Sequence, residues 1–198
     1  MKPIIFYDTE TTGLPDWKAP SESETQPHLV QLGAILADSE TRKIISTLDL
    51  VIKPDGWVIP KEVSDIHGIT EDIASAFGVP EKEAVQLFLS MWNGGDRVAH
   101  NKTFDQRLLR IALKRYFGDN EALQEQWSEK DNHHCTMLMA KPIMQMLPKS
   151  RYGYKSPKLS EAYKHFTGKD LVDAHTAMAD AKACMEVYWA IKDLESDQ

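Results

Sequence analysis

The sequence predicts an α/β fold in which helices cover a mixed sheet, and three observations lead to this prediction. Apolar runs of strand length occupy the first 54 residues. From Pro80 onward, apolar residues recur at three- and four-residue spacing, which is typical of helices. A short apolar run at residues 97–100 interrupts this helical part. At 198 residues, with 42% hydrophobic and 27% charged residues, we expect one globular domain spanning residues 1–198.

The strands are predicted from apolar runs bounded by turn-forming residues. Residues 4–7 form the first run, and residues 29–37 and 44–52 form the next two. The polar residues between the last two runs predict a tight turn, so we expect a hairpin. The polar segment at residues 16–26 is expected to be a surface loop.

The helices are predicted from their apolar spacing and from residues that end helices. One helix begins near residue 80 and ends at an Asn-Gly-Gly sequence before the short strand at residues 97–100. The remaining predicted helices cover residues 104–116, 136–146, 158–166 and 175–194. This order of elements favours helices packed on a sheet.

Composition and charge exclude several classes of protein. The net charge of −7 argues against a protein that coats duplex DNA by bulk charge. Cys135 and Cys184 are too few for a disulfide framework, so we expect reduced thiols and a cytoplasmic location. No apolar stretch reaches the roughly 18–20 residues that a membrane span needs. An acidic residue at position 8 also interrupts any signal-peptide core, and we expect no membrane association.

One segment opposes the overall acidity. Residues 141–169 contain seven basic residues and one acidic residue, which gives this segment a net charge of +6. Cations with interleaved aromatic rings can follow a single strand of nucleic acid, the cations meeting phosphates and the rings stacking on bases. A solvated loop is the alternative. The candidate strand-binding residues are Lys149, Arg151, Tyr152, Tyr154 and Lys155.

Paired carboxylates follow the first predicted strand. Asp8 and Glu10 are two residues apart, so a strand would point both side chains to the same face. Two such carboxylates can bind one divalent ion, or a pair of ions with help from further acids. An isolated Asp-x-Glu pair is common, and its meaning depends on the other motifs.

Three further motifs accompany this pair in the order of the chain. They are Ile66-His67-Gly68-Ile69-Thr70, then Ala99-His100-Asn101-Lys102-Thr103-Phe104-Asp105, and finally His175-Thr176-Ala177-Met178-Ala179-Asp180. Together with Asp8-Thr9-Glu10-Thr11-Thr12-Gly13-Leu14, they resemble the motifs of the DEDDh-type (DnaQ-like) 3′–5′ exonucleases, the family of the polymerase III epsilon proofreading subunit. The resemblance covers nearly the whole chain.

The resemblance implies a fold and a metal site. The fold would be ribonuclease-H-like, with a mixed five-stranded sheet flanked by helices. Asp8, Glu10, Asp105 and Asp180 would bind two divalent ions, Mg²⁺ or Mn²⁺. This ligand set is physically reasonable because converging carboxylates repel one another until cations neutralise them. Two ions can also stabilise the attacking and leaving oxygens of a phosphodiester displacement.

The resemblance also implies that His175 is the general base. On one regular helix His175 would point about 140° away from Asp180, because an α-helix has 3.6 residues per turn. We therefore expect His175 in a loop or first turn, from which both side chains can approach one site. A sister subclass has Tyr four residues before the last Asp, where this sequence has Thr176. Imidazole side chains exchange protons near neutral pH, as a general base must.

Weaker matches imply contacts with substrate. The candidate substrate-binding residues are Thr11, Leu14, Glu62, His67 and Asn101. In the family, the positions of Glu62 and His67 contact the terminal nucleotide, and that of Leu14 wedges against its base. Each of these residues also has a purely structural interpretation.

The sequence thus predicts a 3′–5′ exonuclease that releases nucleoside monophosphates from single-stranded 3′ ends, with DNA favoured over RNA. An RNA-trimming or short-oligoribonucleotide exonuclease is the alternative within this class, because discrimination through the 2′-hydroxyl depends on local shape. A non-catalytic binding module would have to lack a metal ligand, whereas all four acids and the histidine are present. Association with a polymerase and homodimer formation both stay open.

Overall fold

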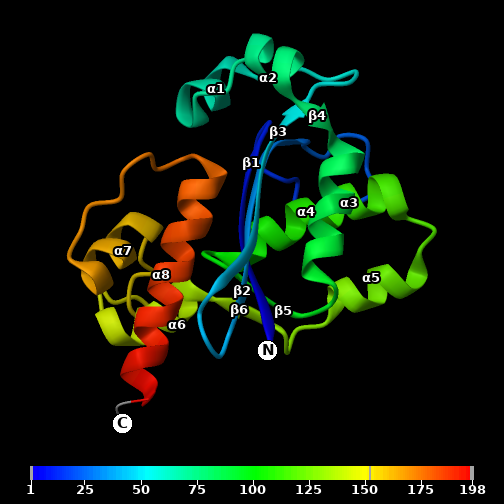
Figure 1. Ribbon diagram of the computed structural model, residues 1–198. Coiled ribbons are helices and arrows are strands. Elements are labelled where there is room, and N and C mark those ends of the chain that lie inside the picture. Colours follow the sequence, from blue (N-terminus) through cyan, green and yellow to red (C-terminus); the bar gives the residue numbers. More distant parts are fainter. Residues whose placement is uncertain (1, 152, 197–198) are drawn as a thin grey trace.

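The computed structural model describes residues 2–151 and 153–196 and shows a sheet between two layers of helices (Figure 1). Within these residues the sheet has six strands in the order β4-β3-β2-β1-β5-β6. β2 is antiparallel to β1 and β3, and the other three pairings are parallel. The strands are β1 (Pro3–Thr11), β2 (Leu29–Asp38), β3 (Ile44–Lys53), β4 (Val79–Pro80), β5 (Asp96–Ala99) and β6 (His133–Cys135).

The mixed sheet with flanking helices confirms the predicted fold class, and the hairpin of β2 and β3 is also confirmed. The expected number of five strands needs correction. A sixth strand arises because Val79 and Pro80 pair with Ile52 and Lys53 at the end of β3. A pairing of two residues carries no apolar periodicity, so the sequence pattern did not indicate it.

Helices cover both faces of the sheet. In Figure 1, α3, α4 and α5 lie on one face, and α6, α7 and α8 lie on the other. α1 and α2 lie beyond the end of the sheet at which β1 finishes. The helices are α1 (Lys61–His67), α2 (Glu71–Phe77), α3 (Glu81–Trp92), α4 (Lys102–Phe117), α5 (Glu121–Ser128), α6 (Thr136–Met144), α7 (Leu159–Thr167) and α8 (Ala177–Ser196).

The five predicted helices correspond to α3, α4, α6, α7 and α8. The last one begins at Ala177 rather than His175, because His175 has a φ of 72°, which is incompatible with a right-handed helix. The predicted loop at residues 16–26 is a loop. The structure adds α1, α2, α5 and β6, which the sequence pattern did not predict.

Alternation along β1 divides the core between the two layers. Ile5 and Tyr7 pack with residues of α3 and α4, whereas Ile4 and Phe6 pack with residues of α8. Because successive side chains of a strand point to opposite faces, Asp8 and Glu10 continue the α8 side of this pattern. The burial pattern of β1 therefore directs both carboxylates toward α8.

None of the helices in the described ranges is both long enough and apolar enough to cross a membrane.

Candidate active site

The site forms where β1 extends beyond its neighbour β5. The parallel pairing of these strands runs from Ile4 with Asp96 to Phe6 with Val98, and β5 ends at Ala99. β1 continues to Thr11, so its last residues have an open edge on the β5 side. The half-buried carboxylates of Asp8 and Glu10 lie on this extension.

Asp105 reaches the open edge from the other helical layer. It lies in the first turn of α4 and is buried. Its Oδ1 accepts hydrogen bonds from the backbone N–H of Thr9, at 3.1 Å, and from the Thr9 hydroxyl, at 2.9 Å. The carboxylate thus occupies the acceptor position that a neighbouring strand would otherwise fill, and this brings it close to Asp8. No sequence signal had singled out Thr9.

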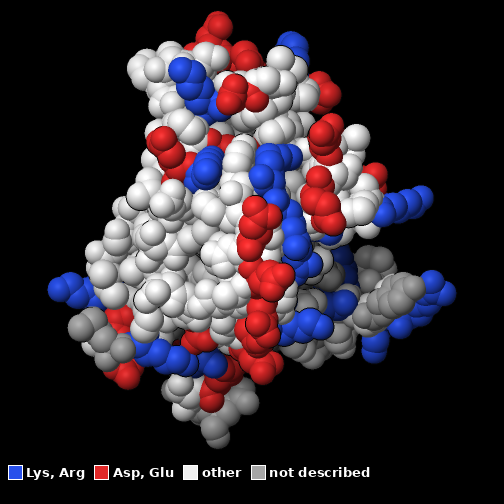
Figure 2. All heavy atoms as spheres, turned by 90° about the vertical axis from the view of Figure 1, so that its right-hand side faces the viewer, with Lys and Arg blue, Asp and Glu red and all other residues white. Residues whose placement is uncertain are grey.

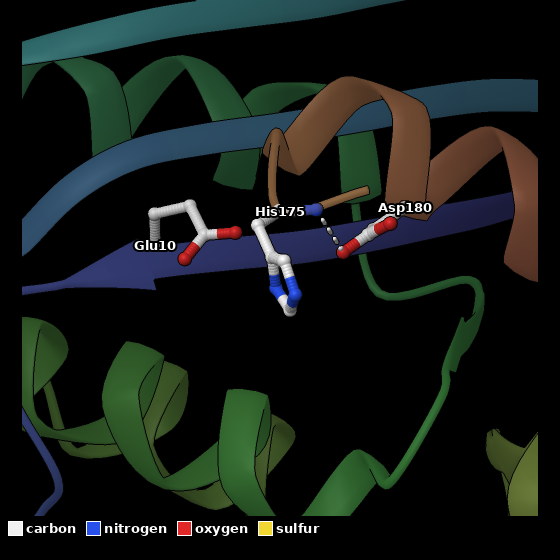
Figure 3. A group of neighbouring side chains, drawn as sticks. All are labelled: Glu10, His175 and Asp180. Carbon is white, nitrogen blue, oxygen red and sulfur yellow. Dashed lines mark hydrogen bonds between the residues drawn. The ribbon is translucent and has the colours of Figure 1, made fainter. Parts of the chain in front are cut away.

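His175 and Asp180 come from the start of α8 and the turn before it. The backbone N–H of His175 donates to Asp180 Oδ2 at 3.2 Å. Figure 3 shows the imidazole between the carboxylates of Glu10 and Asp180, and potential ligand atoms of the three residues lie within 4.8 Å of one another. The left-handed backbone at His175 sets the turn that allows this approach, as expected from the five-residue spacing.

Electrostatic interactions link the four acids of the site. Burial raises the pKa of Asp8 well above its usual value, and the carboxylates of Asp105, Asp180 and Glu10 raise it further. Burial, and to a smaller extent repulsion from the carboxylates of Asp180 and Asp105, raises the pKa of Glu10 to about 8. Burial raises the pKa of Asp105 to about 7, although the hydrogen bonds from Thr9 oppose this shift. Burial also raises the pKa of Asp180.

This donor set fits divalent cations. Four carboxylates supply the oxygen ligands that Mg²⁺ and Mn²⁺ prefer. The Oδ1 of Asp180 is buried and has no hydrogen-bond partner within the described part of the chain, so it is available as a ligand. Bound cations would also remove the mutual repulsion that the raised pKa values report.

A cavity of about 340 Å³ adjoins Glu10, and apolar side chains form most of its wall. Leu14 and Ile66 line it although they are 81% and 58% exposed, which leaves them accessible to a planar ring. His67 also lines the cavity and is buried. Glu62 lies one helical turn before Ile66 on α1 and is exposed.

His67, which lines this cavity, carries an unpartnered hydrogen-bond donor. Its Nδ1 accepts the backbone N–H of Ile69 at 3.1 Å, so the neutral ring carries its proton on Nε2. Burial lowers the pKa of His67 and favours this neutral form. Nε2 is buried and has no partner among the residues that the structure describes.

Thr11 and Asn101 have local structural roles. The Thr11 hydroxyl donates to the carbonyl of Gly13 at 2.8 Å, which holds the turn after β1. Asn101 is the N-cap residue of α4, exposed, with a left-handed backbone and no capping hydrogen bond from its side chain. The Asn101 side chain therefore has no capping role, whereas the Thr11 hydroxyl holds the turn and Thr11 lines the cavity beside Glu10.

The basic segment lies between α6 and α7, and several of its side chains have partners. Lys155 forms an ion pair with Glu161, with Nζ 2.6 Å from Oε1. The ammonium of Lys149 lies 5.0 Å from the ring centroid of Tyr154, and the Tyr154 hydroxyl donates to Gln145 at 3.1 Å. Lys149 and Arg151 are exposed. Tyr152 falls outside the described residues.

The opposite helical layer offers no comparable basic surface in the view of Figure 2. On the face over α3, α4 and α5, acidic and basic side chains run in adjacent bands. Such interleaved charges produce no extended positive field. The segment between α6 and α7 is therefore the more basic of these two surfaces.

A family comparison identifies the chain. A model of the exonuclease family, RNase_T, matches residues 5–188. The chain belongs to this exonuclease family. It is therefore a nuclease, a hydrolase of phosphodiester bonds, and the resemblance to the DEDDh-type exonucleases is confirmed.

Relatives of this exonuclease-family protein come from phage and bacteria. It is 28% identical to the uncharacterized exonuclease CP81 of Escherichia phage 186, over 94% of this chain and 87% of the relative. It is 29% identical to a PolC-type DNA polymerase III of Mycoplasmopsis pulmonis, over 93% of this chain but 11% of the relative. It is 33% identical over 102 residues to the DNA polymerase III subunit epsilon of Haemophilus influenzae, which covers 51% of this chain and 37% of the subunit.

Solved structures share the fold. Exonuclease I of E. coli in complex with a dA16 oligonucleotide has a TM-score of 0.69 and 25% identity, covering 98% of this chain and 41% of that one. A product-bound structure of exonuclease I has a TM-score of 0.72, also with 25% identity, and the match covers 44% of its chain. This chain thus spans less than half of the length of exonuclease I.

Proposed function

We propose that this protein is a 3′–5′ exonuclease that releases nucleoside monophosphates from single-stranded 3′ ends, with DNA favoured over RNA. Two divalent ions and a histidine base would serve the hydrolysis. The observation that carries the proposal is the convergence of Asp8, Glu10, Asp105 and Asp180 beside His175 in a chain of the exonuclease family. The relatives support the choice of DNA, because the exonuclease I structures contain DNA oligonucleotides and two relatives are DNA polymerase components.

The four carboxylates would hold the ions at the open edge of β1. When bound, the ions supply neutralising charge and Lewis-acid polarisation of the phosphodiester and of the attacking water. Asp105 is braced by Thr9, and Asp180 by the backbone of His175, so both carboxylates keep fixed directions. Such preorganisation limits the reorganisation needed during the reaction.

His175 would take the proton from the attacking water. Its ring is exposed and lies between Glu10 and Asp180, so water can reach it. The bond between the His175 backbone N–H and Asp180 ties the base to the ligand, so their relative position is kept. His175 is the histidine in the described chain that combines access to solvent with proximity to the acids.

The cavity beside Glu10 would receive the terminal nucleotide. Leu14 and Ile66 would contact the base through apolar faces, and His67 Nε2 would donate to a polar atom of the sugar or phosphate. Glu62 and Asn101 are exposed, and we propose that they add polar contacts to the substrate. Thr11 also lines this cavity and would contact the nucleotide there, while its hydroxyl holds the turn after β1.

Matched DNA and RNA strands test the proposal directly. Each strand is labelled at the 5′ end and incubated with Mg²⁺, with Mn²⁺ or with EDTA. We expect a ladder of progressively shortened 5′-labelled DNA and free mononucleotides, with no products in EDTA. Removal of nucleotides from the 5′ end would refute the polarity, and faster loss of RNA would establish the oligoribonucleotide alternative.

Asparagine variants test the ligand assignment. Asp8→Asn and Asp180→Asn keep the side-chain shape but remove a negative charge, and we expect each to lower the hydrolysis rate by at least about 10³-fold. Asp193→Asn is the control, because Asp193 is exposed and pairs with Arg42 elsewhere. Thermal denaturation verifies that the variants fold. Near-parental turnover by either ligand variant would refute the metal site.

Two assembly states extend this proposal. Similarity to a polymerase subunit favours association with a polymerase, and a homodimer is the other expectation. Sedimentation of the purified chain, alone and mixed with a replicative polymerase, distinguishes them by mass.

A further inference from the structure

The start of α8 lies unusually close to β2. Gly33 of β2 is paired with Asp8 of β1 and is buried. A Cβ atom at position 33 would lie 2.4 Å from the carbonyl carbon of Ala177, 2.5 Å from its oxygen and 2.6 Å from the nitrogen of Met178. All three atoms belong to the backbone. No side-chain change in α8 would relieve the clash, so this packing requires glycine at position 33.

Gln31 makes a directed contact with the same point. Its Oε1 accepts the backbone N–H of Ala177 at 3.0 Å, and its Nε2 donates to Asp49 Oδ1 at 2.8 Å. A backbone N–H only donates and an ionised carboxylate only accepts, so just one orientation of the amide satisfies both partners. Gln31 is buried and is paired with Glu10 in the β1–β2 register.

These two contacts define where α8 begins. Ala177 is its first residue, with His175 two residues before it and Asp180 three residues after it. The bond from the His175 N–H to Asp180 Oδ2 joins the turn and the first helical turn into one unit. Gly33 therefore sets how closely this unit approaches the sheet, and the Gln31 amide sets its rotation and its position along the strand.

We propose that Gly33 and Gln31 are positioning residues that fix His175 and Asp180 relative to Asp8 and Glu10. This inference rests on the proposed function, because it assigns these residues to the same site. Neither residue needs to touch substrate or metal. The register reinforces the arrangement, because Gly33 and Gln31 lie directly beside Asp8 and Glu10, so one stretch of β2 aligns both halves of the site.

The first test removes the directed contact without changing the side-chain length. Gln31→Met leaves the Ala177 N–H without its acceptor. A misplacement of about 1 Å can cost up to about 10²-fold in rate, and loss of a group that orients a metal ligand costs about 10–100-fold in metal affinity. We expect kcat to fall about 10–100-fold with KM within about twofold of the parent value, and Mn²⁺ affinity to fall about tenfold by calorimetry.

Hydrogen exchange gives a readout that needs neither metal nor turnover. In the metal-free protein the Ala177 amide should be protected, and Gln31→Met should accelerate its exchange without a global change in protection. Gln124→Met is the matched control. Gln124 is half-buried, and its amide donates to the carbonyls of Leu113 and Phe117, away from the site. We expect parental kcat and Mn²⁺ affinity in this control.

The second test changes the packing distance. Ordinary Cβ contacts begin at 3.4 Å, so Gly33→Ala requires α8 to withdraw by about 1 Å from the 2.4 Å approach. Gly95→Ala is its control, because its added Cβ would meet Pro3 O at 3.2 Å, where a small shift suffices. We expect Gly33→Ala to lower kcat at least as strongly as Gln31→Met. Should Gly33→Ala fail to fold, Gln31→Met alone decides the matter.

The outcomes separate this inference from the proposed function. If the parent protein degrades DNA and binds Mn²⁺ while Gln31→Met retains parental kcat and Mn²⁺ affinity, the positioning role is refuted and the proposed function stands. If the parent protein neither binds Mn²⁺ nor degrades single strands, the proposed function fails first. A loss confined to thermal stability, with kcat unchanged, would reduce Gln31 to a structural residue.

Discussion

At the residue scale, the site combines side chains that local motifs reveal with contacts that they do not. The five candidate catalytic residues lie in short motifs that can be recognised in the sequence: Asp8, Glu10, Asp105, His175 and Asp180. The structure brings Glu10, His175 and Asp180 together. The residues that hold them were not predictable. The bond between Thr9 and Asp105 spans 96 positions, and the bond between Gln31 and Ala177 spans 146. One sequence without its fold does not show such distant pairings.

The unpartnered Nε2 of His67 is another feature that the sequence alone could not predict in full. The motif of His67 marked it as a substrate contact, but burial and the bond from Ile69 decide that Nε2 is the unpartnered donor among the described residues. The bond from Ile69 depends on the turn after α1, and the burial of the ring depends on tertiary packing. The identity of the residue was thus predictable and its protonation pattern was not.

Replacement of the proposed base tests the chemistry at this scale. We expect His175→Ala to slow single-turnover hydrolysis of a labelled DNA strand by about 10²–10⁴-fold, the usual contribution of a general base. Binding of the strand, measured by fluorescence anisotropy, should stay within about threefold. His165→Ala on α7 is the control, because this histidine is also exposed. An unchanged single-turnover rate for His175→Ala would assign proton removal to another group.

At the scale of elements, predictability follows length and apolar spacing. The continuous apolar run of β2 and the periodic segments of α4 and α8 bury many apolar side chains, so their sequences indicate their structure. α5 has eight residues and buries only Trp127, which packs against Trp92 and the Arg97 guanidinium. Such short helices depend on tertiary contacts, which apolar spacing does not reveal.

The segment between α6 and α7 offers a prediction for an element as a whole. If it holds the DNA strand, the combined neutralisation of Lys149, Arg151 and Lys155 should weaken binding and flatten its salt dependence. Each phosphate contact with a single strand contributes about 0.7 to the slope of log K against log salt. We expect Lys149→Ala to reduce the slope more than Lys155→Ala, because Lys155 is already paired with Glu161.

Titrations at several salt concentrations measure these slopes. Lys61→Ala serves as the control, because Lys61 pairs with Asp65 on the exposed face of α1. If the triple variant kept the parental slope, the segment would be a solvated loop that does not bind the DNA strand.

At the scale of the whole molecule, the acids couple stability to pH and to metal. A carboxyl whose pKa is higher in the folded protein than in the unfolded chain favours folding when protonated. Its contribution is present at low pH and is lost as pH rises from the unfolded value, near 4, through the folded value. The folded values are about 7 for Asp105 and about 8 for Glu10, so the loss extends from about pH 4 to about pH 8.

Thermal denaturation should show this dependence. In EDTA we expect the Tm to fall between pH 5 and pH 8. Mg²⁺ at 100 times its Kd adds about 2.7 kcal/mol, which is about 5–10 °C for a chain of this size. The gain should be larger at pH 8 than at pH 5, because protonated carboxyls bind the ion poorly.

Asp8→Asn provides the comparison, since one fewer acid should make the Tm in EDTA less sensitive to pH. A parent protein whose metal-free Tm rises toward pH 8 would contradict the clustering of the four carboxylates.

Asp105 has two roles that one substitution can separate: it accepts hydrogen bonds from Thr9, and it adds a negative charge to the site. Thr9 requires only an acceptor, and the oxygen of an amide would serve it as well as that of a carboxylate. Asparagine at position 105 would therefore keep the open edge of β1 covered while it withdraws one negative charge from the cluster. If the proposed function holds, such a variant would bind single-stranded 3′ ends without hydrolysing them, so it could be used to capture these ends from a mixture.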